Sequence, residues 1–465
     1  MTLPSDQSLQ ALLQRLVRPA AGEAGRPFVL GETGTVDLYT LRAAVLTAMK
    51  QNLGEAEPLL VATQDRSRIA AAVLAALAGG NELILPHAIS PAALRDLRDN
   101  HRVRFVFAED TISLPQGMAE LPLGAPPLPG TTGEFRARGP EESIVGLFTG
   151  GSTGQARMWA KTARNLVGEA AFLARRFRIG PEDVILAAVT PQHIYGLLFS
   201  VLLPLVSGAS VAPETPRFQG EIEKSLVEYR ATVLAAAPAH YRALRGKEIP
   251  GHCLKLAVSS GGLLPEEDSL GFSSRTGVWV TEVYGSTETG GVATRARAQG
   301  EQTWTPFACV QWRTRQEQLC VQSPFLSPGL PLDGEGFFVT GDRVQVERDG
   351  TFTLLGRVDG VVKVAGKRVN LDGVEARIKA LPRVRDAYVL ALSSDTMREA
   401  EIVCLVAPDD EGFDDEDFRE SLRSVLEPSA LPRRVRWVPE IPLTPAGKRD
   451  RERAERFFSE LPPKE

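Results

Sequence analysis

The sequence has few cysteines, and their spacing does not suggest a site. Its four cysteines, Cys253, Cys309, Cys320 and Cys404, lie far apart, and none belongs to a Cys-x-x-Cys pair with a histidine nearby. This spacing favours neither a zinc site nor a disulfide framework. A reducing compartment fits such cysteine usage best.

An excess of one charge and a long apolar segment are also missing. The 53 Lys and Arg residues nearly balance the 58 Asp and Glu residues, which leaves a formal net charge of −5. This balance creates no field that would gather nucleic acid or anionic lipid. No segment stays apolar over the roughly 20 residues that span a bilayer, and the N-terminal residues lack the pattern of a secretory signal. We expect a cytoplasmic protein with no membrane span and no nucleic-acid partner.

Alternating strand-like and helix-like segments are present instead. Residues 58–86 contain an apolar run, a polar turn, an alanine-rich stretch ended by Gly79 and Gly80, and a second apolar run. Ser90 is the predicted N-cap of the next helix, with Pro91 at its first position. This alternation predicts an α/β fold whose parallel or mixed sheets are covered by helices.

The pattern changes between residues 336 and 370. Apolar and polar residues alternate there, and a turn is predicted at Asp349 and Gly350, as in antiparallel hairpins. We place a domain boundary close to Arg357. Residues 1–356 are expected to form a large N-terminal domain, and residues 357–465 a small α+β C-terminal domain.

Residues 149–157, TGGSTGQAR, form the first of four loops that suggest chemistry. Glycines let backbone N–H groups converge on an anion, hydroxyl groups add donors, and Arg157 supplies positive charge. Taken alone, such a Gly/Ser/Thr cluster is more often a flexible surface turn, and the stretch after Arg157 looks helical. The Gly-Lys-Ser/Thr ending of a P-loop is absent, which disfavours a P-loop NTPase.

Each of three further loops contains one charged residue that suggests a function. Glu288 is the lone carboxylate of YGSTETGG, where it suits either Mg²⁺ bound to phosphates or a helix N-cap. Asp342, in VTGD, is suited to accept both hydroxyls of a ribose or to occupy a simple turn. Lys448, in PLTPAGKRDR, has no distinction by itself, since most lysines so placed are solvated.

The order and spacing of these loops resemble the adenylate-forming (ANL) superfamily, which includes acyl-CoA synthetases, nonribosomal-peptide adenylation domains and luciferases. TGGSTGQAR is similar to its phosphate loop, YGSTE to its adenine and magnesium loop, and VTGD to its ribose-binding step. GRVDGVVKVAG is similar to its interdomain hinge, and PLTPAGKRDR to its catalytic-lysine loop. TPQHIYGL and SSGG are further signatures, so the resemblance covers most of the chain.

The resemblance implies that residues 1–356 are an AMP-binding domain and residues 357–465 a mobile C-terminal domain. It implies ATP and Mg²⁺ as cofactors, with Glu288 as the metal ligand. The residues implied to hold the nucleotide are Thr149, Gly151, Ser152, Thr153, Gly154, Arg157, Gly261, Gly262, Tyr284, Gly285, Ser286, Thr287, Asp342, Arg357 and Lys448. The residues implied to be catalytic are Thr153, His193, Thr287, Glu288 and Lys448.

The implied reaction activates a carboxylic acid as acyl-AMP, releases pyrophosphate and then transfers the acyl group to a thiol. The thiol belongs either to CoA or to the phosphopantetheine of an acyl carrier protein. Asp359 occupies the hinge position, and Lys363 and Gly366 lie in the loop that would face the thiol in the second step. Lys448 would serve adenylation and not thioester formation.

The implied substrate pocket combines aromatic side chains with small residues. Its expected members are His193, Tyr195, Ser259, Gly261, Gly285, Gly290 and Gly291. A flat aryl acid fits such a set, as does a fatty acid in a narrow tunnel. Faint similarity to ligases of aryl-polyene pathways favours the aryl acid. His193 is alternatively a packed core histidine.

The sequence departs from the family pattern in the first loop. Gly150 replaces a common serine, Ala156 a usual proline, and Arg157 a lysine, so one hydroxyl is lost while the positive charge is kept. A non-catalytic, nucleotide-binding relative is the alternative of another class. The presence of Glu288 and Lys448 argues against it, because decayed homologues tend to lose these residues.

Overall fold

A computed structural model describes residues 5–18, 27–30, 38–86, 89–108, 112–124, 137–149, 157–262, 264–357, 360–364, 367–392, 401–409, 415–445 and 447–459. The chain divides into two compact units. Unit 1 comprises residues 1–311 and 322–331, and unit 2 comprises residues 312–321 and 332–465. We describe each unit by itself.

The first sheet of unit 1 is mainly parallel. Its strand order is β4-β3-β1-β2-β5-β6, and only β6 runs antiparallel to its neighbour. The strands are β1 (Leu59–Ala62), β2 (Leu83–Leu85), β3 (Phe105–Ala108), β4 (Ala119–Glu120), β5 (Ser143–Thr149) and β6 (Arg157–Thr162). The nearby helices are α1 (Asp6–Val17), α2 (Leu38–Asn52), α3 (Arg66–Leu77) and α4 (Pro91–His101).

The predicted start of α4 is confirmed. The Ser90 side chain accepts a hydrogen bond from the Ala93 N–H at 3.2 Å, and Pro91 is the first helical residue. The strands between the helices are buried along their whole length, as in a sheet with both faces covered.

The second sheet of unit 1 has the order β13-β12-β11-β10-β9-β7-β8, and β7 to β11 are parallel to one another. Its strands are β7 (Val184–Ala187), β8 (Ser210–Val211), β9 (Val233–Ala236), β10 (Leu256–Ser259), β11 (Val280–Ser286), β12 (Gly290–Arg295) and β13 (Thr305–Pro306). Its helices are α5 (Glu169–Phe177), α6 (Ile194–Leu197), α7 (Leu203–Ser207), α8 (Gln219–Glu228), α9 (Pro238–Leu244) and α10 (Glu266–Thr276). Two π-helical segments, η1 (Arg164–Gly168) and η2 (Leu198–Leu202), precede α5 and α7.

Unit 2 begins with an antiparallel sheet of order β14-β15-β16-β17. Its strands are β14 (Gln311–Arg315), β15 (Gln318–Gln322), β16 (Phe338–Val346) and β17 (Phe352–Arg357). The turn predicted at Asp349 and Gly350 connects β16 to β17, and Gly350 has the positive φ of 81° that glycine readily adopts there. A short hairpin of β18 (Val361–Val364) and β19 (Lys367–Asn370) follows.

The last sheet of unit 2 has helices on both faces. It consists of β20 (Val384–Leu392), β21 (Glu401–Pro408) and β22 (Arg434–Trp437), with helices α11 (Leu371–Lys379), α12 (Asp415–Val425) and α13 (Arg451–Ser459). Alternate residues of β21 join two different apolar clusters. Ile402 and Cys404 pack with the cluster of α11 and α12, whereas Val403 and Leu405 pack with that of α13. Coverage of both faces explains the continuous apolar run in this strand.

The described residues confirm the predicted α/β class with mainly parallel sheets in unit 1. The stretch after Arg157, expected to be helical, instead starts as strand β6, because it pairs with β5. None of the helices in the described ranges combines the length and the apolar composition needed to cross a membrane.

Candidate active site

The first predicted loop connects the two strands of an antiparallel hairpin. Thr149 at the end of β5 pairs with Arg157 at the start of β6. The residues between them, 150–156, lie outside the described ranges, and so do the predicted phosphate contacts Gly151, Ser152, Thr153 and Gly154. Arg157 is exposed, and its guanidinium carbon lies 4.0 Å from the centre of the Trp159 ring. This cation–π contact orients the charge beside the loop.

The second predicted loop is the tip of the hairpin between β11 and β12. Ser286 pairs with Gly290, and the Ser286 and Thr289 side chains close the turn by accepting hydrogen bonds from each other's N–H, at 3.2 and 3.0 Å. Thr287 and Glu288 therefore occupy the tip. Glu288 is half-buried, and its carbonyl oxygen accepts a 2.8 Å hydrogen bond from the Ser327 N–H.

Close packing inside this hairpin explains its glycines. A Cβ atom on Gly285 would lie 2.2 Å from the Gly290 carbonyl oxygen. One on Gly290 would lie 2.6 Å from Phe325 Cβ, and one on Gly291 would lie 2.8 Å from Phe307 Cε2. These positions need glycine for the interior of unit 1, so Gly290 and Gly291 do not by themselves indicate room for an aromatic substrate. Their place in the pocket wall stays a prediction.

A buried ion pair supports the strand that leads to this tip. Glu282 is 3% exposed and receives two hydrogen bonds from Arg295, at 2.9 and 3.0 Å. The Arg295 guanidinium lies over the Trp304 ring at 4.3 Å, and Trp304 in turn packs against Tyr284, the predicted adenine contact. Bidentate pairs of this kind fix geometry as well as charge. Nothing in the sequence alone pairs Glu282 with Arg295.

The predicted pocket residues come from several neighbouring elements of unit 1. His193 immediately precedes α6 and is half-buried. The Tyr195 hydroxyl donates a 2.7 Å hydrogen bond to the Val258 carbonyl oxygen, which ties α6 to β10. Burial of this hydroxyl raises the pKa of Tyr195 well above its ordinary value. Tyr195 is therefore a neutral, positioned phenol and not an acid–base group near neutral pH.

Small polar residues follow β10. Ser259 is 1% exposed, and its hydroxyl oxygen has no hydrogen-bond partner among the described residues. The next residue, Ser260, donates to the Val283 carbonyl oxygen at 2.8 Å, which links β10 to β11. Gly261 has a φ of 84°, and no described residue beyond its chain neighbours has an atom within 4 Å of a Cβ built there. Among the same residues, a Cβ on Gly262 would meet only Pro238, at 3.6 Å. Open space beside these two glycines suits the predicted contact with a nucleotide base or an acid.

Lys161 and Glu169 belong to none of the sequence motifs, yet both are buried beside the tip. Lys161 lies in β6 and is 1% exposed, and Glu169 begins α5 and is 2% exposed. The Lys161 ammonium donates to the Phe325 carbonyl oxygen at 3.2 Å, and the Glu169 carboxylate accepts from the Gly291 N–H at 2.7 Å. A lysine and a glutamate eight residues apart are ordinary on a surface. In the folded chain both side chains are buried, and they contact the distant Phe325 and Gly291 backbone groups.

In unit 2, the predicted ribose-binding pair lies on adjacent strands. Asp342 of β16 is in register with Arg357 of β17, and the Asp342 N–H donates to the Thr340 hydroxyl at 3.1 Å. The side chains of Arg357 and Lys363 are not described, and Asp359 and Gly366 lie outside the described residues. The hinge and the thiol-step loop therefore stay predictions.

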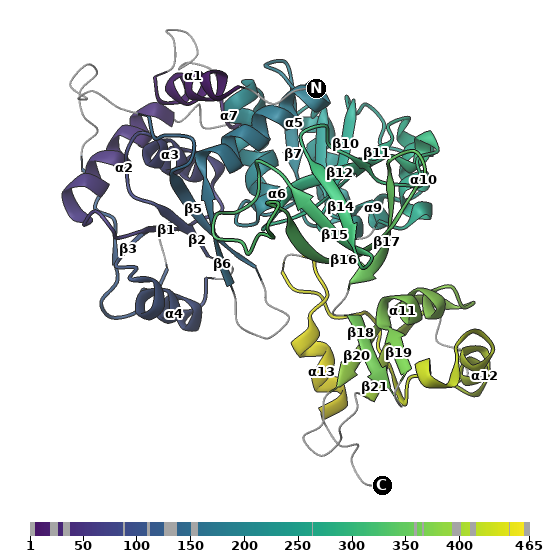
Figure 1. Cartoon of the computed structure of the whole chain (residues 1–465). Coiled ribbons are helices and arrows are strands. Elements are labelled where there is room, and N and C mark those ends of the chain that lie inside the picture. Colours follow the sequence, from purple (N-terminus) through teal and green to yellow (C-terminus); the bar gives the residue numbers. More distant parts are fainter. Residues whose placement is uncertain are drawn as a thin grey trace. The chain divides into compact units, whose positions relative to one another are not determined.

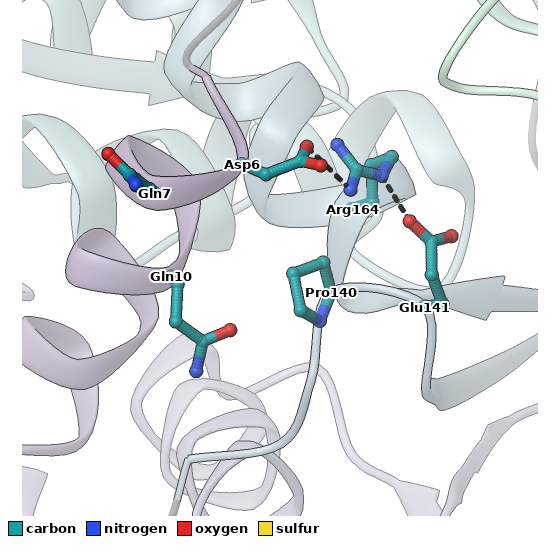
Figure 2. Close-up of a pocket in the computed structure, with 6 residues that line it drawn as sticks. All are labelled: Asp6, Gln7, Gln10, Pro140, Glu141 and Arg164. Carbon is teal, nitrogen blue, oxygen red and sulfur yellow. Dashed lines mark hydrogen bonds and ion pairs between the residues drawn. The ribbon is translucent and has the colours of Figure 1, made fainter.

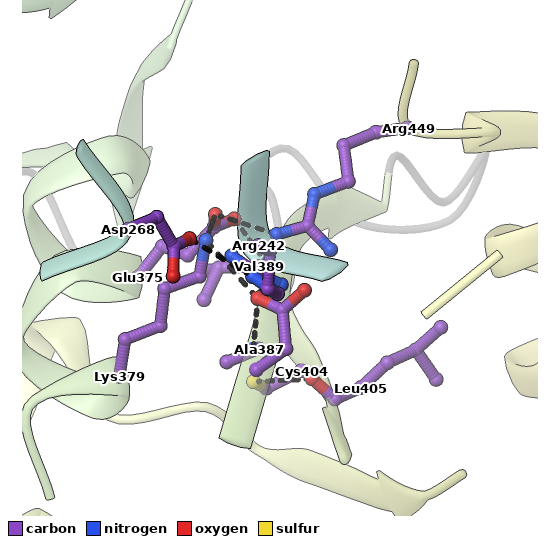
Figure 3. Close-up of polar contacts among 10 residues, drawn as sticks. Arg242, Asp268, Glu375, Lys379, Ala387, Val389, Cys404, Leu405 and Arg449 are labelled. Carbon is purple, nitrogen blue, oxygen red and sulfur yellow. Dashed lines mark hydrogen bonds and ion pairs between the residues drawn. The ribbon is translucent and has the colours of Figure 1, made fainter. Parts of the chain in front are cut away.

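Lys448 is exposed on a tight turn of unit 2. The Thr444 N–H donates to the Lys448 carbonyl oxygen at 2.7 Å, and Gly447, with a φ of 74°, completes the turn. The next residue is anchored: Arg449 lies 2.8 Å from the Asp386 carboxylate and 3.6 Å from that of Glu375. Figure 3 shows Arg449, Glu375 and Lys379 in this group of polar contacts. A fixed neighbour and an exposed ammonium suit a residue that must reach a reactant.

The donor chemistry of the β11–β12 tip matches the groups that the predicted reaction needs. Within the described ranges, no group of three or more His, Cys, Asp or Glu residues is placed to hold a metal ion. Glu288 provides one carboxylate beside the hydroxyl-bearing Ser286 and Thr287. Mg²⁺ bound to a nucleotide takes one or two protein carboxylates and completes its shell with phosphate oxygens and water. The tip therefore fits MgATP.

A separate hollow of about 410 Å³ lies in unit 1 between α1 and η1. Figure 2 shows Arg164 between Asp6 and Glu141, with Gln7, Gln10 and Pro140 around them. Arg164 lies 2.9 Å from Asp6 and also pairs with Glu141. None of the predicted site residues lines this hollow.

Known proteins resemble the chain in sequence and in fold. It is 28% identical over 306 residues to a 4-coumarate–CoA ligase of Cereibacter sphaeroides, covering 64% of this chain and 68% of the ligase. It is 24% identical over 337 residues to a sulfoacetate–CoA ligase of Cupriavidus necator, covering 66% of each chain. The chain thus spans about two thirds of the length of these relatives. ATP-bound MatB from Rhodopseudomonas palustris has the same fold, with a TM-score of 0.83, 20% identity, and coverage of 97% of this chain and 99% of MatB.

Two family models match the chain in succession. Residues 41–322 match the AMP-binding enzyme model, and residues 373–448 match the C-terminal domain of AMP-binding enzymes. The first match alone covers more than half of the chain. The chain therefore belongs to the AMP-binding enzymes, the ANL superfamily of adenylate-forming proteins.

Proposed function

We propose that the chain is an AMP-forming acid–thiol ligase. The observation that carries this proposal is the β11–β12 tip, which presents Glu288 between Thr287 and Thr289 on a hairpin held at both ends. Family membership supports it, as do the names of the two curated relatives, both of which are CoA ligases.

In the first half-reaction, a carboxylate oxygen of the acid attacks the α-phosphorus of ATP. The bond between this phosphorus and the bridging oxygen breaks, and pyrophosphate leaves. Mg²⁺, when bound, supplies positive charge to the phosphate oxygens. The task of the protein is positioning and charge neutralisation, because several anionic groups must meet in one site.

The proposed residues divide the tasks of this step among them. The loop from Thr149 to Arg157 holds the β- and γ-phosphates, and Glu288 orients the metal. Thr287 and Lys448 contact the α-phosphate, and the Lys448 ammonium also attracts the attacking carboxylate. Tyr284 contacts the adenine, and Asp342 with Arg357 holds the ribose. His193 lies beside the acid.

In the second half-reaction, a thiolate attacks the acyl carbon and forms the thioester bond. The bond between this carbon and the phosphate oxygen of AMP breaks, and AMP leaves with its electron pair. We propose CoA or a phosphopantetheine-bearing carrier protein as the thiol. We propose an aryl acid as the substrate class, since the 4-coumarate ligase is among the relatives. A fatty acid is the competing substrate. Rotation about Asp359 would bring the Lys363–Gly366 loop to the thiol.

The test is pyrophosphate exchange into ATP across a panel of benzoic, cinnamic and fatty acids. Exchange should depend on one class of acid and should fall at least about 100-fold in Glu288→Gln. Mass spectrometry with CoA and with a phosphopantetheinylated carrier protein then identifies the acceptor. Acid-independent ATP hydrolysis without any exchange would overturn the proposal. Binding of ATP without turnover would favour the non-catalytic alternative.

A further inference from the structure

Two buried charged residues, Lys161 and Glu169, support the β11–β12 tip that carries Glu288. Glu169 binds the Gly291 N–H, three residues after Glu288 in the chain. Lys161 binds the Phe325 carbonyl oxygen, two residues before Ser327, whose N–H binds the Glu288 carbonyl oxygen. Glu169 thus supports the chain just after Glu288, and Lys161 supports the Phe325–Ser327 segment that is hydrogen-bonded to Glu288.

Asn165, between Lys161 and Glu169 in the chain, strengthens the same connection. Its side-chain amide donates to the carbonyl oxygens of Pro324 and Leu326, at 3.0 and 3.1 Å. The segment around Phe325 is therefore fixed by three hydrogen bonds from one short part of the chain. This part follows directly after the predicted phosphate loop, so the segments proposed to hold phosphates and metal share one support.

The two charges depend on each other. Burial lowers the pKa of Lys161, and the charges of Glu169 and Glu288 oppose this decrease. Burial raises the pKa of Glu169, and Lys161 with the Gly291 N–H opposes this increase. The second carboxylate oxygen of Glu169 has no hydrogen-bond donor among the described residues. A buried charge without its counter-charge is costly, so neither group is dispensable alone.

We propose that Lys161 and Glu169 are a pair of positioning residues that hold Glu288 in place for the metal of bound MgATP. The proposal rests on the proposed function of Glu288 as the metal ligand. Lys161 and Glu169 touch neither metal nor substrate. They act through the backbone of the tip and of the segment around Phe325.

The decisive variant is Glu169→Gln, which keeps an acceptor for the Gly291 N–H but removes the charge. The readout is the affinity for Mn²⁺ in the presence of ATP, measured by electron paramagnetic resonance without any acid. We expect Glu169→Gln to weaken Mn²⁺ binding about tenfold, because supporting residues of metal sites typically contribute this much. The double variant Lys161→Met/Glu169→Gln should bind Mn²⁺ at least as weakly as Glu169→Gln, because it also loses the hydrogen bond from Lys161 to the Phe325 carbonyl oxygen.

The matched control is Lys255→Met. Lys255 pairs with Asp183 at 2.7 Å, and both precede strands of the second sheet, at the ends opposite to the β11–β12 tip. This variant should lower the melting temperature and leave Mn²⁺ affinity unchanged. Wild-type affinity in Glu169→Gln would overturn the proposal, as would a double variant that binds Mn²⁺ as tightly as the wild type.

A second variant covers the case in which Glu169→Gln does not fold. Glu169→Asp keeps the charge, but its side chain is shorter by one methylene and releases the Gly291 N–H. Mn²⁺ binding should weaken here too, and unchanged binding would contradict the proposal. A wild-type protein that binds Mn²⁺ and ATP yet shows no acid-dependent exchange would refute the proposed function, while this positioning role would still be measurable.

Discussion

Two lysines of the chain differ as much as lysines can in a folded protein. Lys161 of unit 1 is 1% exposed and bound to a main-chain oxygen, whereas Lys448 of unit 2 is exposed on a turn. The charges of Glu169 and Glu288 oppose the decrease that burial causes in the pKa of Lys161. Lys448 is followed by Arg449, which forms an ion pair with Asp386. A motif draws attention to Lys448, and none draws attention to Lys161.

The difference teaches what burial does to a charge. A buried ammonium interacts with groups that the fold holds next to it. Its removal therefore changes the free energy of unfolding and the positions of those groups. An ammonium on the surface contributes little to stability, but it remains available to anionic reactants. The predictions below separate these two kinds of contribution.

The largest effect is expected for Lys448→Ala. If Lys448 neutralises charge during adenylation, acid-dependent pyrophosphate exchange should fall by about 100- to 1,000-fold. Thioester formation from preformed acyl-AMP should keep much of its rate. Single-turnover assays of both half-reactions check this, with the exposed Lys224→Ala as control. Equal losses in both halves would contradict the division of labour.

Lys161→Met should have the largest effect on stability. It removes the buried hydrogen bond from the Lys161 ammonium to the Phe325 carbonyl oxygen, so we expect a loss of about 2–3 kcal/mol in the free energy of unfolding. Lys448→Ala should change it by less than about 0.5 kcal/mol. Urea unfolding followed by circular dichroism provides both values. Similar losses of stability in the two variants would contradict the proposed difference between the buried and the exposed lysine.

Gly291→Ala tests the packing above Glu169. The new Cβ would lie 2.8 Å from the Phe307 ring and 3.2 Å from a Glu169 oxygen, so we expect a loss of about 1–3 kcal/mol. Gly262→Ala is the matched control, since its Cβ would meet Pro238 at an ordinary 3.6 Å. Thermal unfolding of both variants gives the comparison. If the two variants are equally stable, the hairpin accommodates the added methyl group by a small shift, contrary to this prediction.

The smallest effect concerns the pair of Asp183 and Lys255, which is only partly buried. Burial raises the pKa of Asp183, but hydrogen bonds from Lys255, the Gly180 N–H and Thr232 outweigh this and lower the pKa below its ordinary 3.8. The stabilisation is therefore present above about pH 4 and is lost as pH falls through the lowered pKa.

Asp183→Asn tests this pH dependence. It should cost about 1–2 kcal/mol at pH 7, and the difference from the wild type should shrink below pH 4. Urea unfolding across this pH range measures it. A difference that stays constant with pH would assign the cost to packing alone.

The sequence predicts the parts of the fold that local chemistry controls. The N-cap at Ser90, the turn at Asp349 and Gly350, and the alternation of strands and helices all depend on residues a few positions apart. The continuous apolar runs of the strands by themselves indicate sheets covered on both faces. Family signatures add the order of the loops, which no local pattern provides.

The support of the Glu288 tip could not be predicted in this way. Lys161 meets a carbonyl oxygen 164 residues away, and Glu169 meets an N–H 122 residues away. The glycines at 290 and 291 suggest an open pocket in the sequence, whereas the structure shows interior packing behind them. Long-range pairs of this kind depend on the completed fold, so no window of the sequence contains them.

The division of the chain into units has a consequence for any domain rotation. Because residues 312–321 belong to unit 2 and residues 322–331 to unit 1, the polypeptide passes between the units at 311–312, 321–322 and 331–332. A swing about Asp359 alone would leave all three passages untouched. It would instead divide unit 2 between β17 and β18, so that its antiparallel sheet stays behind while α11, α12 and α13 travel together. If the proposed hinge at Asp359 is correct, truncation or transplantation of the C-terminal part should therefore cut after Arg357, and not where the compact unit begins.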